Sequence, residues 1–250
     1  MKIVHRLRAY FNLVGLFLRH PICNIYVNFK LLPVRQAIRF PIFIYSKTKF
    51  RSLKGRGIIH GKVSPCMIRI GNDTCYVATS KPYSVWTIDG LIEFNGPFSF
   101  SYGTYVLVAE GAKLIFGKES FIGSETKIIC FDNIHIGNNV RVPWECQIMD
   151  TSFHYVKEET GNIKSLTKPI MIKDNVWVGN RTTIGKGSVI PEYSIIASNS
   201  LVSKDLSSFG EHCMFAGIPV KLIQSGITRI FDEEEQSGLD NKFGYIRIKL

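Results

Sequence analysis

Aliphatic residues recur every six positions in the C-terminal half of the chain. Six residues keep this spacing without a miss: Ile172, Val178, Ile184, Ile190, Ile196 and Val202. The positions between them are rich in Gly, Asn, Asp, Lys and Ser, which suit tight corners. A period of six fits neither an α-helix nor a simple alternating strand. It predicts a short strand followed by a corner, repeated, with the aliphatic residue always pointing inward.

The same period is present earlier in the chain. Phe116, Ile122, Ile128 and Ile134 are spaced by six, and a second frame, shifted by two, holds Ile136, Val142 and Ile148. Three six-residue units make one triangular coil, and one coil cannot bury its own apolar face, so several coils must stack. The pattern therefore predicts an all-β solenoid, a parallel β-helix over residues 55–206 that is imperfect at its start.

The remaining segments differ from the repeat in composition. Residues 1–54 are basic, apolar and partly helical by pattern, and residues 207–250 form a C-terminal extension with a short helix expected over 222–236. The period breaks over residues 154–169, a polar run that contains Gly161 and Pro169. We expect this run to be a loop extruded from the β-helix.

The charge of the chain is unevenly placed. The formal net charge is +11, and fourteen Lys or Arg residues precede the first acidic residue, Asp73. Such asymmetry indicates an anionic partner, and nucleic acid, an anionic membrane surface and a phosphorylated ligand all qualify. The six cysteines are scattered without a CxxC pair, which predicts buried thiols in a reducing compartment rather than a zinc site or a disulfide framework.

The apolar stretch from Tyr10 to Leu18 follows several basic residues. It is interrupted by Asn12 and Gly15, lacks a small-residue cleavage site and is shorter than the roughly 20 residues of a membrane-spanning helix. Two interpretations stay open. The segment either lies on a bilayer surface as a basic amphipathic helix or packs as a helix on the rest of the fold.

Motifs around the loop point to a family. The run IMDTSFHYV precedes the loop, KPIMIKDNVWVGN follows it, and SKD and GIPVKLI come later. Over residues 110–224 this order resembles the hexapeptide-repeat acyltransferases, in the branch of sugar and polysaccharide O-acetyltransferases. The resemblance implies a left-handed β-helix and a homotrimer with active sites between subunits. It also implies transfer of an acetyl group from acetyl-CoA, without a metal, to a hydroxyl of a sugar, polysaccharide unit or lipid-linked glycan.

The resemblance implies that His154 is the general base. An acceptor hydroxyl is a weak nucleophile until a base takes its proton, and imidazole can do so near neutral pH. For Asp150 two interpretations remain. Its carboxylate either orients the imidazole or holds the acceptor, or it caps a turn of the backbone.

The resemblance also implies, position by position, which residues contact CoA. Trp177 matches an aromatic that flanks the pantetheine arm, and Asn180 and Ser198 match small or polar positions beside that arm. Ser203 and Lys204 match a pair near the nucleotide. Lys221 matches a basic residue near the phosphates, where a point positive charge suits the ligand.

Other functions remain as alternatives. A metal-dependent hydratase of the same fold needs three converging histidines, which the spacing of His135, His154 and His212 does not supply. A non-catalytic binding scaffold and an N-acetyltransferase acting on an amino sugar stay open. Nucleic-acid binding is not favoured, because no nucleic-acid motif accompanies the basic N-terminus. We expect a cytoplasmic protein whose N-terminus allows peripheral contact with the inner, anionic membrane face.

Overall fold

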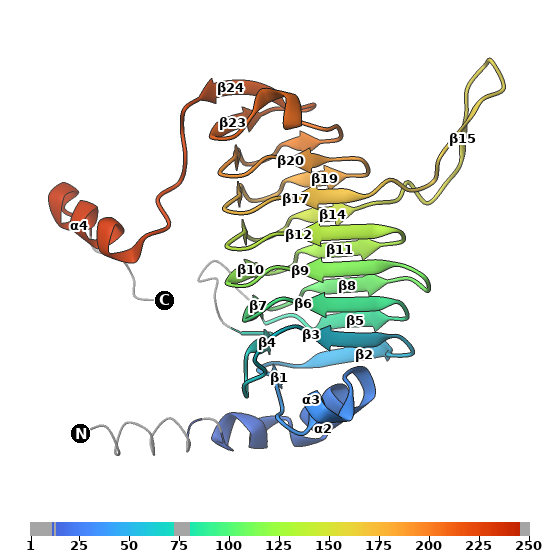
Figure 1. The fold of residues 1–250 in the computed structure, drawn as a ribbon, viewed down its shortest axis with the longest axis vertical. Coiled ribbons are helices and arrows are strands. Elements are labelled where there is room, and N and C mark those ends of the chain that lie inside the picture. Colours follow the sequence, from blue (N-terminus) through green and yellow to red (C-terminus); the bar gives the residue numbers. More distant parts are fainter. Residues whose placement is uncertain (1–11, 13, 73–80, 246–250) are drawn as a thin grey trace.

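The computed structural model describes residues 12, 14–72 and 81–245 (Figure 1). Residues 1–11 and 13, which include Tyr10, Phe11 and Leu13 of the apolar stretch, therefore lie outside the described residues. Within the described ranges no helix has the length and apolar character needed to cross a membrane.

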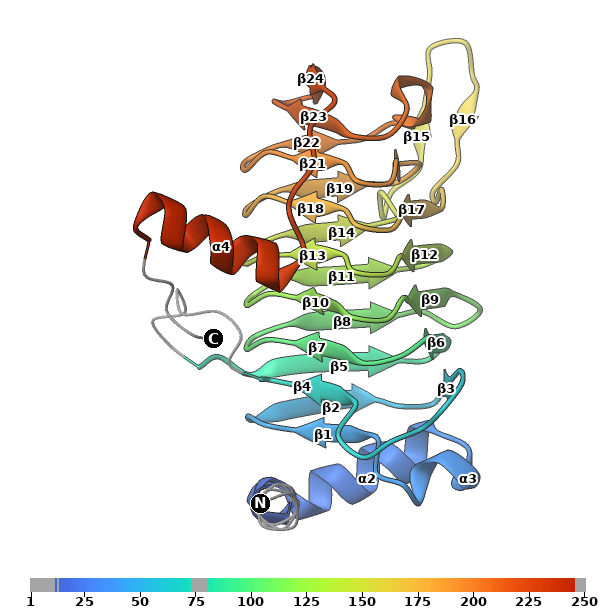
Figure 2. The same ribbon diagram turned by 60° about the vertical axis from the view of Figure 1, so that its left-hand side comes forward.

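The chain winds as a triangular coil, visiting three parallel sheets in turn (Figures 1 and 2). The fold is a left-handed parallel β-helix, as predicted. We call its faces sheets A, B and C. Sheet A holds β1 (Ile42–Ile44), β4 (Ile68–Ile70), β7 (Phe98–Phe100), β10 (Ser120–Ile122), β13 (Arg141–Val142), β18 (Trp177–Val178), β21 (Ile195–Ile196), β23 (Cys213–Ala216) and β24 (Lys221–Ser225).

Sheet B holds β2 (Thr48–Ser52), β5 (Ser84–Ile88), β8 (Tyr105–Val108), β11 (Lys127–Cys130), β14 (Gln147–Met149), β19 (Thr183–Gly185) and β22 (Leu201–Val202). Sheet C holds β3 (Arg56–Ile59), β6 (Leu91–Phe94), β9 (Lys113–Phe116), β12 (Asn133–Ile136), β17 (Ile170–Ile172) and β20 (Val189–Ile190). Each coil therefore has three corners, from A to B, from B to C, and from C to A, where the next coil begins.

The aliphatic column predicted from the period of six is the core of the upper coils. Ile172, Val178, Ile184, Ile190, Ile196 and Val202 are all fully buried. The strands begin before the predicted boundary at residue 55, because β1 and β2 already pair in sheets A and B. The sequence period is weak there because the first coils are longer: β1 and β4 begin 26 residues apart, whereas β18 and β21 begin 18 apart. In the coils that follow, aromatic side chains take inward positions, and Phe94, for example, stacks on Phe116 of the next coil at 5.3 Å.

Corners depend on residues that tolerate a left-handed backbone or a close approach. Asn139 and Asn175 have φ of +55° and +57° at the C-to-A corners of successive coils, and Asn199 has φ of +55° at an A-to-B corner. Gly179 serves the second purpose, because a Cβ there would lie 2.3 Å from the backbone nitrogen of Ser198 in the next coil. The glycines of the repeat are thus explained by the stacking of coils.

Helices close the N-terminal end of the β-helix. Residues 14–19 are helical, and α2 (Pro21–Leu31) and α3 (Val34–Ala37) lie across the first coil, at the bottom of Figures 1 and 2. The helix α2 contacts β1 and β3. This placement stops further strands from adding to β1.

The C-terminal extension differs from the expected helix over 222–236. Residues 221–225 are strand β24, which pairs antiparallel with β23 because β23 would otherwise leave an open sheet edge. A short 3₁₀ helix, Ser207–Phe209, precedes β23. The α-helix of the extension follows β24, as α4 (Glu233–Phe243). Asp232 caps α4 by accepting a hydrogen bond from the backbone N–H of Glu235 at 2.8 Å.

Candidate functional site

His154 lies at the B-to-C corner that follows β14, where the period breaks. The chain leaves the coil there and forms a hairpin of β15 (Val156–Lys157) and β16 (Ile163–Lys164) before it returns at β17. Figure 1 shows this hairpin projecting far from the body of the β-helix. His154 is exposed, and among the described residues its ring has no hydrogen-bond partner. The imidazole is therefore open to a molecule that approaches this corner.

The base of the hairpin is held by a lysine from the next coil. Lys186 Nζ donates to the Ser152 hydroxyl at 2.9 Å and to the carbonyl of Leu166 at 3.3 Å. The Ser152 hydroxyl also lies 3.1 Å from the carbonyl oxygen of His154. This network joins both strands of the hairpin base, and it fixes the backbone that carries the imidazole.

Asp150 is fully buried, and its carboxylate accepts hydrogen bonds from the backbone of the preceding coil. Its two carboxylate oxygens accept from the N–H groups of Phe131, at 2.8 Å, and Asp132, at 2.9 Å. Burial raises the pKa of Asp150, and these two donors oppose that rise. Among the described residues no hydrogen bond joins Asp150 to the His154 ring. The geometry is that of the capping interpretation, and it does not bring the pair together.

The other described histidines are engaged elsewhere or partly enclosed. His60 lies 2.9 Å from a carboxylate oxygen of Glu93, and His212 stacks on Tyr193 with ring centroids 4.7 Å apart. Burial lowers the pKa of His135 on β12. No group of three His, Cys, Asp or Glu side chains gathers as a metal would require anywhere in the described ranges.

Three of the residues predicted to contact CoA lie at or beside the A-to-B corner of the upper coils. Trp177 on β18 is 40 % exposed, and Asn180 follows it at the corner. Ser198 occupies the same corner one coil later and donates to the Asn180 side-chain oxygen at 2.6 Å. The structure therefore brings this group together on one edge.

The remaining three predicted residues lie elsewhere in the last coil. Ser203 and Lys204 follow β22 at the B-to-C corner, and Lys204 Nζ sits over the Phe209 ring at 5.8 Å. Lys221 is exposed at the start of β24. His154 shares an edge with Lys204, whereas Trp177 lies on sheet A and Asn180 and Ser198 at the next edge. A single chain thus distributes the predicted site over two edges of the triangular prism.

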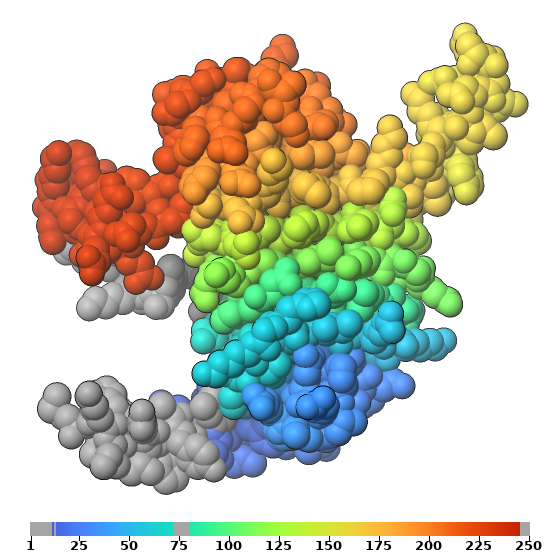
Figure 3. Space-filling view, in the orientation of Figure 1, coloured from blue at the N-terminus to red at the C-terminus, as the bar shows by residue number. Residues whose placement is uncertain are grey.

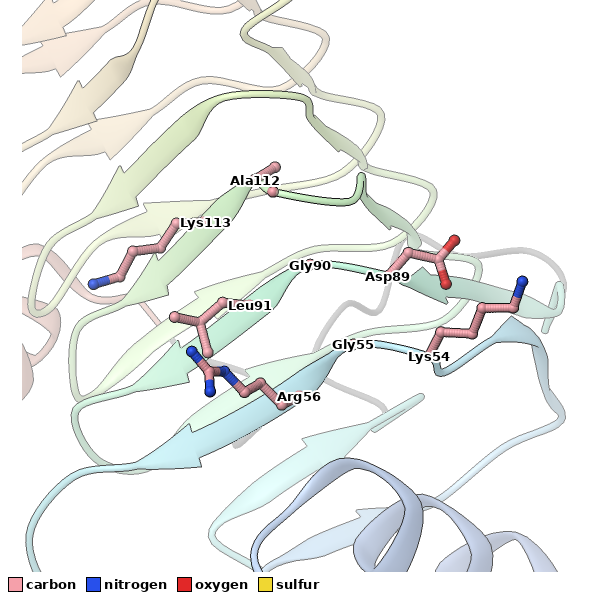
Figure 4. Close-up of a pocket in the computed structure, with 9 residues that line it drawn as sticks. Lys54, Gly55, Arg56, Asp89, Gly90, Leu91, Ala112 and Lys113 are labelled. Carbon is pink, nitrogen blue, oxygen red and sulfur yellow. The ribbon is translucent and has the colours of Figure 1, made fainter.

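A hollow of about 440 Å³ crosses the B-to-C corner in the lower coils (Figure 4). Lys54, Arg56 and Lys113 line it together with Asp89 and small residues of the corner. It contains none of the residues predicted for catalysis or for CoA. The candidate residues therefore lie on two edges of the upper coils and not in this hollow.

Comparison with known proteins gives relatives but no matching family model. The galactoside O-acetyltransferase of Escherichia coli (strain K12) is 27 % identical over 51 % of this chain and 58 % of its own length. An uncharacterised 24.8 kDa protein from the cps region of Klebsiella pneumoniae is 27 % identical over 81 % of this chain and 87 % of its own. The chain thus spans little more than half of the first relative.

Among solved structures, the polySia-specific acetyltransferase NeuO superposes with a TM-score of 0.60 at 17 % identity, over 84 % of this chain and 91 % of NeuO. The resemblance to the hexapeptide-repeat acyltransferases is confirmed. At this identity the superposition concerns the fold, which the two chains share along most of their length.

Sequence reasoning missed two residues of this region. Lys186 carries no motif, and only the stacking of coils brings it under the hairpin. Arg229 lies in the C-terminal extension, and its guanidinium sits 5.7 Å from the centre of the Trp177 ring. A cation beside an aromatic that is far away in sequence leaves no local signal, since the contact depends on how the extension returns along sheet A.

Proposed function

We propose that this protein transfers an acetyl group from acetyl-CoA to a hydroxyl of a sugar, a polysaccharide unit or a lipid-linked glycan, with His154 as general base. One observation carries the proposal. The exposed imidazole of His154 makes no hydrogen bond to the described residues and stands on a braced corner of a fold that acetyltransferases share. Acetyl-CoA is made and used in the cytoplasm, which we infer to be the place of the reaction.

The chemistry that His154 performs follows from the weakness of a hydroxyl nucleophile. A ring nitrogen of His154 takes the hydroxyl proton as the oxygen attacks the acetyl carbonyl. The tetrahedral intermediate then collapses, the carbon–sulfur bond breaks, and the imidazolium returns the proton to the departing thiolate. The products are the acetyl ester and free CoA. Acetyl-CoA supplies only the thioester, whose acetyl group is activated towards attack.

The residues of the upper coils suit such a donor. The exposed ring of Trp177 offers an apolar surface for an alkyl arm, and the Asn180–Ser198 pair offers polar atoms beside it. Lys204 and Lys221 are exposed cations that suit phosphates. No described metal-ligand cluster is involved in this proposal.

The division of these residues between two edges supports a shared site. We infer that Trp177, Asn180 and Ser198 of one copy face the His154 edge of another, as in a homotrimer. The projecting hairpin suits such an assembly, because Tyr155 is 73 % and Ile163 is 61 % exposed. Large exposed apolar side chains on a protruding element are typical of interfaces.

Complementation tests the shared site directly. His154→Ala and Asn180→Asp are each expected to be inactive when pure. Oligomers that contain both variants are expected to regain part of the activity, because one site in the mixture keeps both intact halves. Mixed oligomers that stay as inactive as their parents would contradict a site built from two subunits.

The transferase assay is thiol release from acetyl-CoA with nucleotide sugars, free glycans and undecaprenyl-linked sugars as acceptors. We expect turnover with at least one acceptor and a loss of about 10²–10⁴-fold for His154→Ala. His60→Ala is the matched control, because it removes an exposed histidine from a distant coil. Equal rates for His154→Ala and wild type would refute the base assignment.

The same panel separates the alternatives. Amino-sugar acceptors test N-acetylation, since a product that resists mild alkaline hydrolysis is an amide and not an ester. If no acceptor reacts and acetyl-CoA does not raise the unfolding temperature, a non-catalytic scaffold is the better description. Binding of acetyl-CoA stabilises the native state by mass action, so its effect on unfolding is independent of the acceptor.

A further inference from the structure

The helix α2 is apolar on the side that faces away from the protein. Ile22, Ile25, Tyr26 and Phe29 follow the spacing i, i+3, i+4 and i+7, which places them on one face. Their exposed fractions are 81 %, 47 %, 47 % and 45 %. A helix in contact with water normally presents polar residues there.

The opposite face of α2 is where the polar residues are. Asn24 and Asn28 are fully buried, and their side chains bind the backbone of β1. Asn28 accepts from the N–H of Ile42 at 3.1 Å and donates to its carbonyl at 2.7 Å, and Asn24 accepts from the N–H of Ile44 at 2.8 Å. These amides satisfy the first strand of sheet A. The two asparagines therefore fix which face of α2 packs against β1, and the apolar residues lie on the face that remains exposed.

The apolar surface continues on both sides of α2. We call it the N-terminal platform: Val14, Leu18, Ile22, Ile25, Tyr26, Phe29, Val34 and Ile38. A hollow of about 570 Å³ opens beside it, with apolar walls that include Phe17, Phe40 and Phe43. Figures 1 and 3 show the platform elements, in blue, at the end of the molecule opposite to the last coils.

Exposed cations surround the platform. Arg19, Lys30, Arg35, Arg39 and Lys62 are exposed on its helices and on the adjoining loop, and Arg39 and Lys62 line the hollow. No acidic residue occurs among residues 1–72. An apolar surface ringed by cations complements an anionic lipid surface, where side chains insert between headgroups and cations meet phosphates.

We propose that the N-terminal platform docks the protein on an anionic lipid bilayer. A second copy of the platform is a poor occupant, because two surfaces with cations and no acidic residues would repel each other. The inference does not depend on the proposed acyl transfer. If the β-helix axis stands normal to the bilayer, the four strand spacings from β1 to β13 put the His154 coil about 20 Å above the platform.

The test is co-sedimentation of the full chain with vesicles, at low and at physiological salt. We expect binding to mixed phosphatidylcholine–phosphatidylglycerol vesicles, weaker binding at higher salt, and little binding to phosphatidylcholine alone. Ile22→Ser/Ile25→Ser should lower the partition coefficient about tenfold or more. Arg35→Gln/Arg39→Gln should lower it about fivefold for each cation removed.

Matched controls carry the same chemical changes on other surfaces. Ile218→Ser/Ile223→Ser removes two side chains that are 74 % and 59 % exposed, just before β24 and on it. Lys127→Gln/Lys157→Gln removes two exposed cations of sheet B and the hairpin. Both controls, and His154→Ala, should bind vesicles like wild type. Normal binding with no acyl transfer would therefore uphold the platform while refuting the enzyme.

Three outcomes would overturn the proposal. The first is the absence of vesicle binding at low salt, and the second is equal binding by platform and control variants. The third is a change of oligomeric state in light scattering for Ile22→Ser/Ile25→Ser without any vesicle binding by wild type, which would assign the platform to a protein interface. Circular dichroism checks that each variant is folded, and α2 should tolerate changes on its outward face.

Discussion

The substitution Asp150→Asn distinguishes a structural role of the Asp150 carboxylate from a catalytic one. The substitution keeps one oxygen, which can still accept from the N–H of Phe131, and turns the other atom into an NH₂ that faces the N–H of Asp132. A hydrogen bond to a charged group contributes about 1.5–3 kcal/mol. Because the side chain is fully buried, water does not replace the lost acceptor. We expect the free energy of unfolding to fall by about 1.5–3 kcal/mol.

Urea unfolding followed by far-ultraviolet circular dichroism measures this loss, and thiol release measures turnover per folded molecule. Turnover should change little, since among the described residues no hydrogen bond links Asp150 to His154. Asp205→Asn is the control, because Asp205 is exposed and accepts from the N–H of Ser207 at 2.7 Å, where water can substitute. Unchanged stability together with a large loss of turnover would refute this reasoning and restore Asp150 to the catalytic site.

Three further predictions concern the core, a surface network and the acyl donor. Ile196→Ala should lower the free energy of unfolding by about 2–5 kcal/mol in urea, because its side chain is fully buried in the column. Burial raises the pKa of Glu93, but Lys113 at 3.0 Å and His60 at 2.9 Å outweigh it, so the pKa is lowered. The resulting stability is present above the usual glutamate pKa and lost as pH falls through the lowered value. The free energy of unfolding of wild type should exceed that of Glu93→Gln by about 1 kcal/mol or less at neutral pH, since both partners are exposed. This difference should shrink in acid. Finally, acetyl-CoA should quench tryptophan fluorescence in wild type and much less in Trp177→Phe; equal quenching would contradict the assignment of Trp177.

The β-helix could be predicted because its signal is local. Each coil repeats the same short strand and corner, so the inward position returns at a fixed spacing, and every aliphatic residue from Ile172 to Val202 in that frame is buried. The signal weakened where Phe and Trp took over the inward positions, since the repeat then no longer consists of one residue type. The start at β1 was missed because the inward isoleucines of β1 and β4 begin 26 residues apart, against 18 for β18 and β21, so no period of six links them.

The prediction of a helix over 222–236 was wrong because the structure of the C-terminal extension depends on contacts that are not local. Residues 221–225 have no strand repeat, and they form β24 because β23 presents an unpaired edge. That edge exists only after the coils have stacked. For the same reason, the sequence did not predict the contact of Arg229 with Trp177 or that of Lys186 with Ser152 at the base of the hairpin.

The sequence by itself determined the class of fold, the position of the extruded loop motif and the basic character of the N-terminus, because these depend on spacing, composition and charge along the chain. Only the tertiary structure decided which corner each candidate residue occupies, that Asp150 binds backbone and not His154, and that α2 packs by its asparagines and exposes its apolar face. A sequence records which residues recur, whereas the faces they share and the edges they meet arise from the winding of the chain.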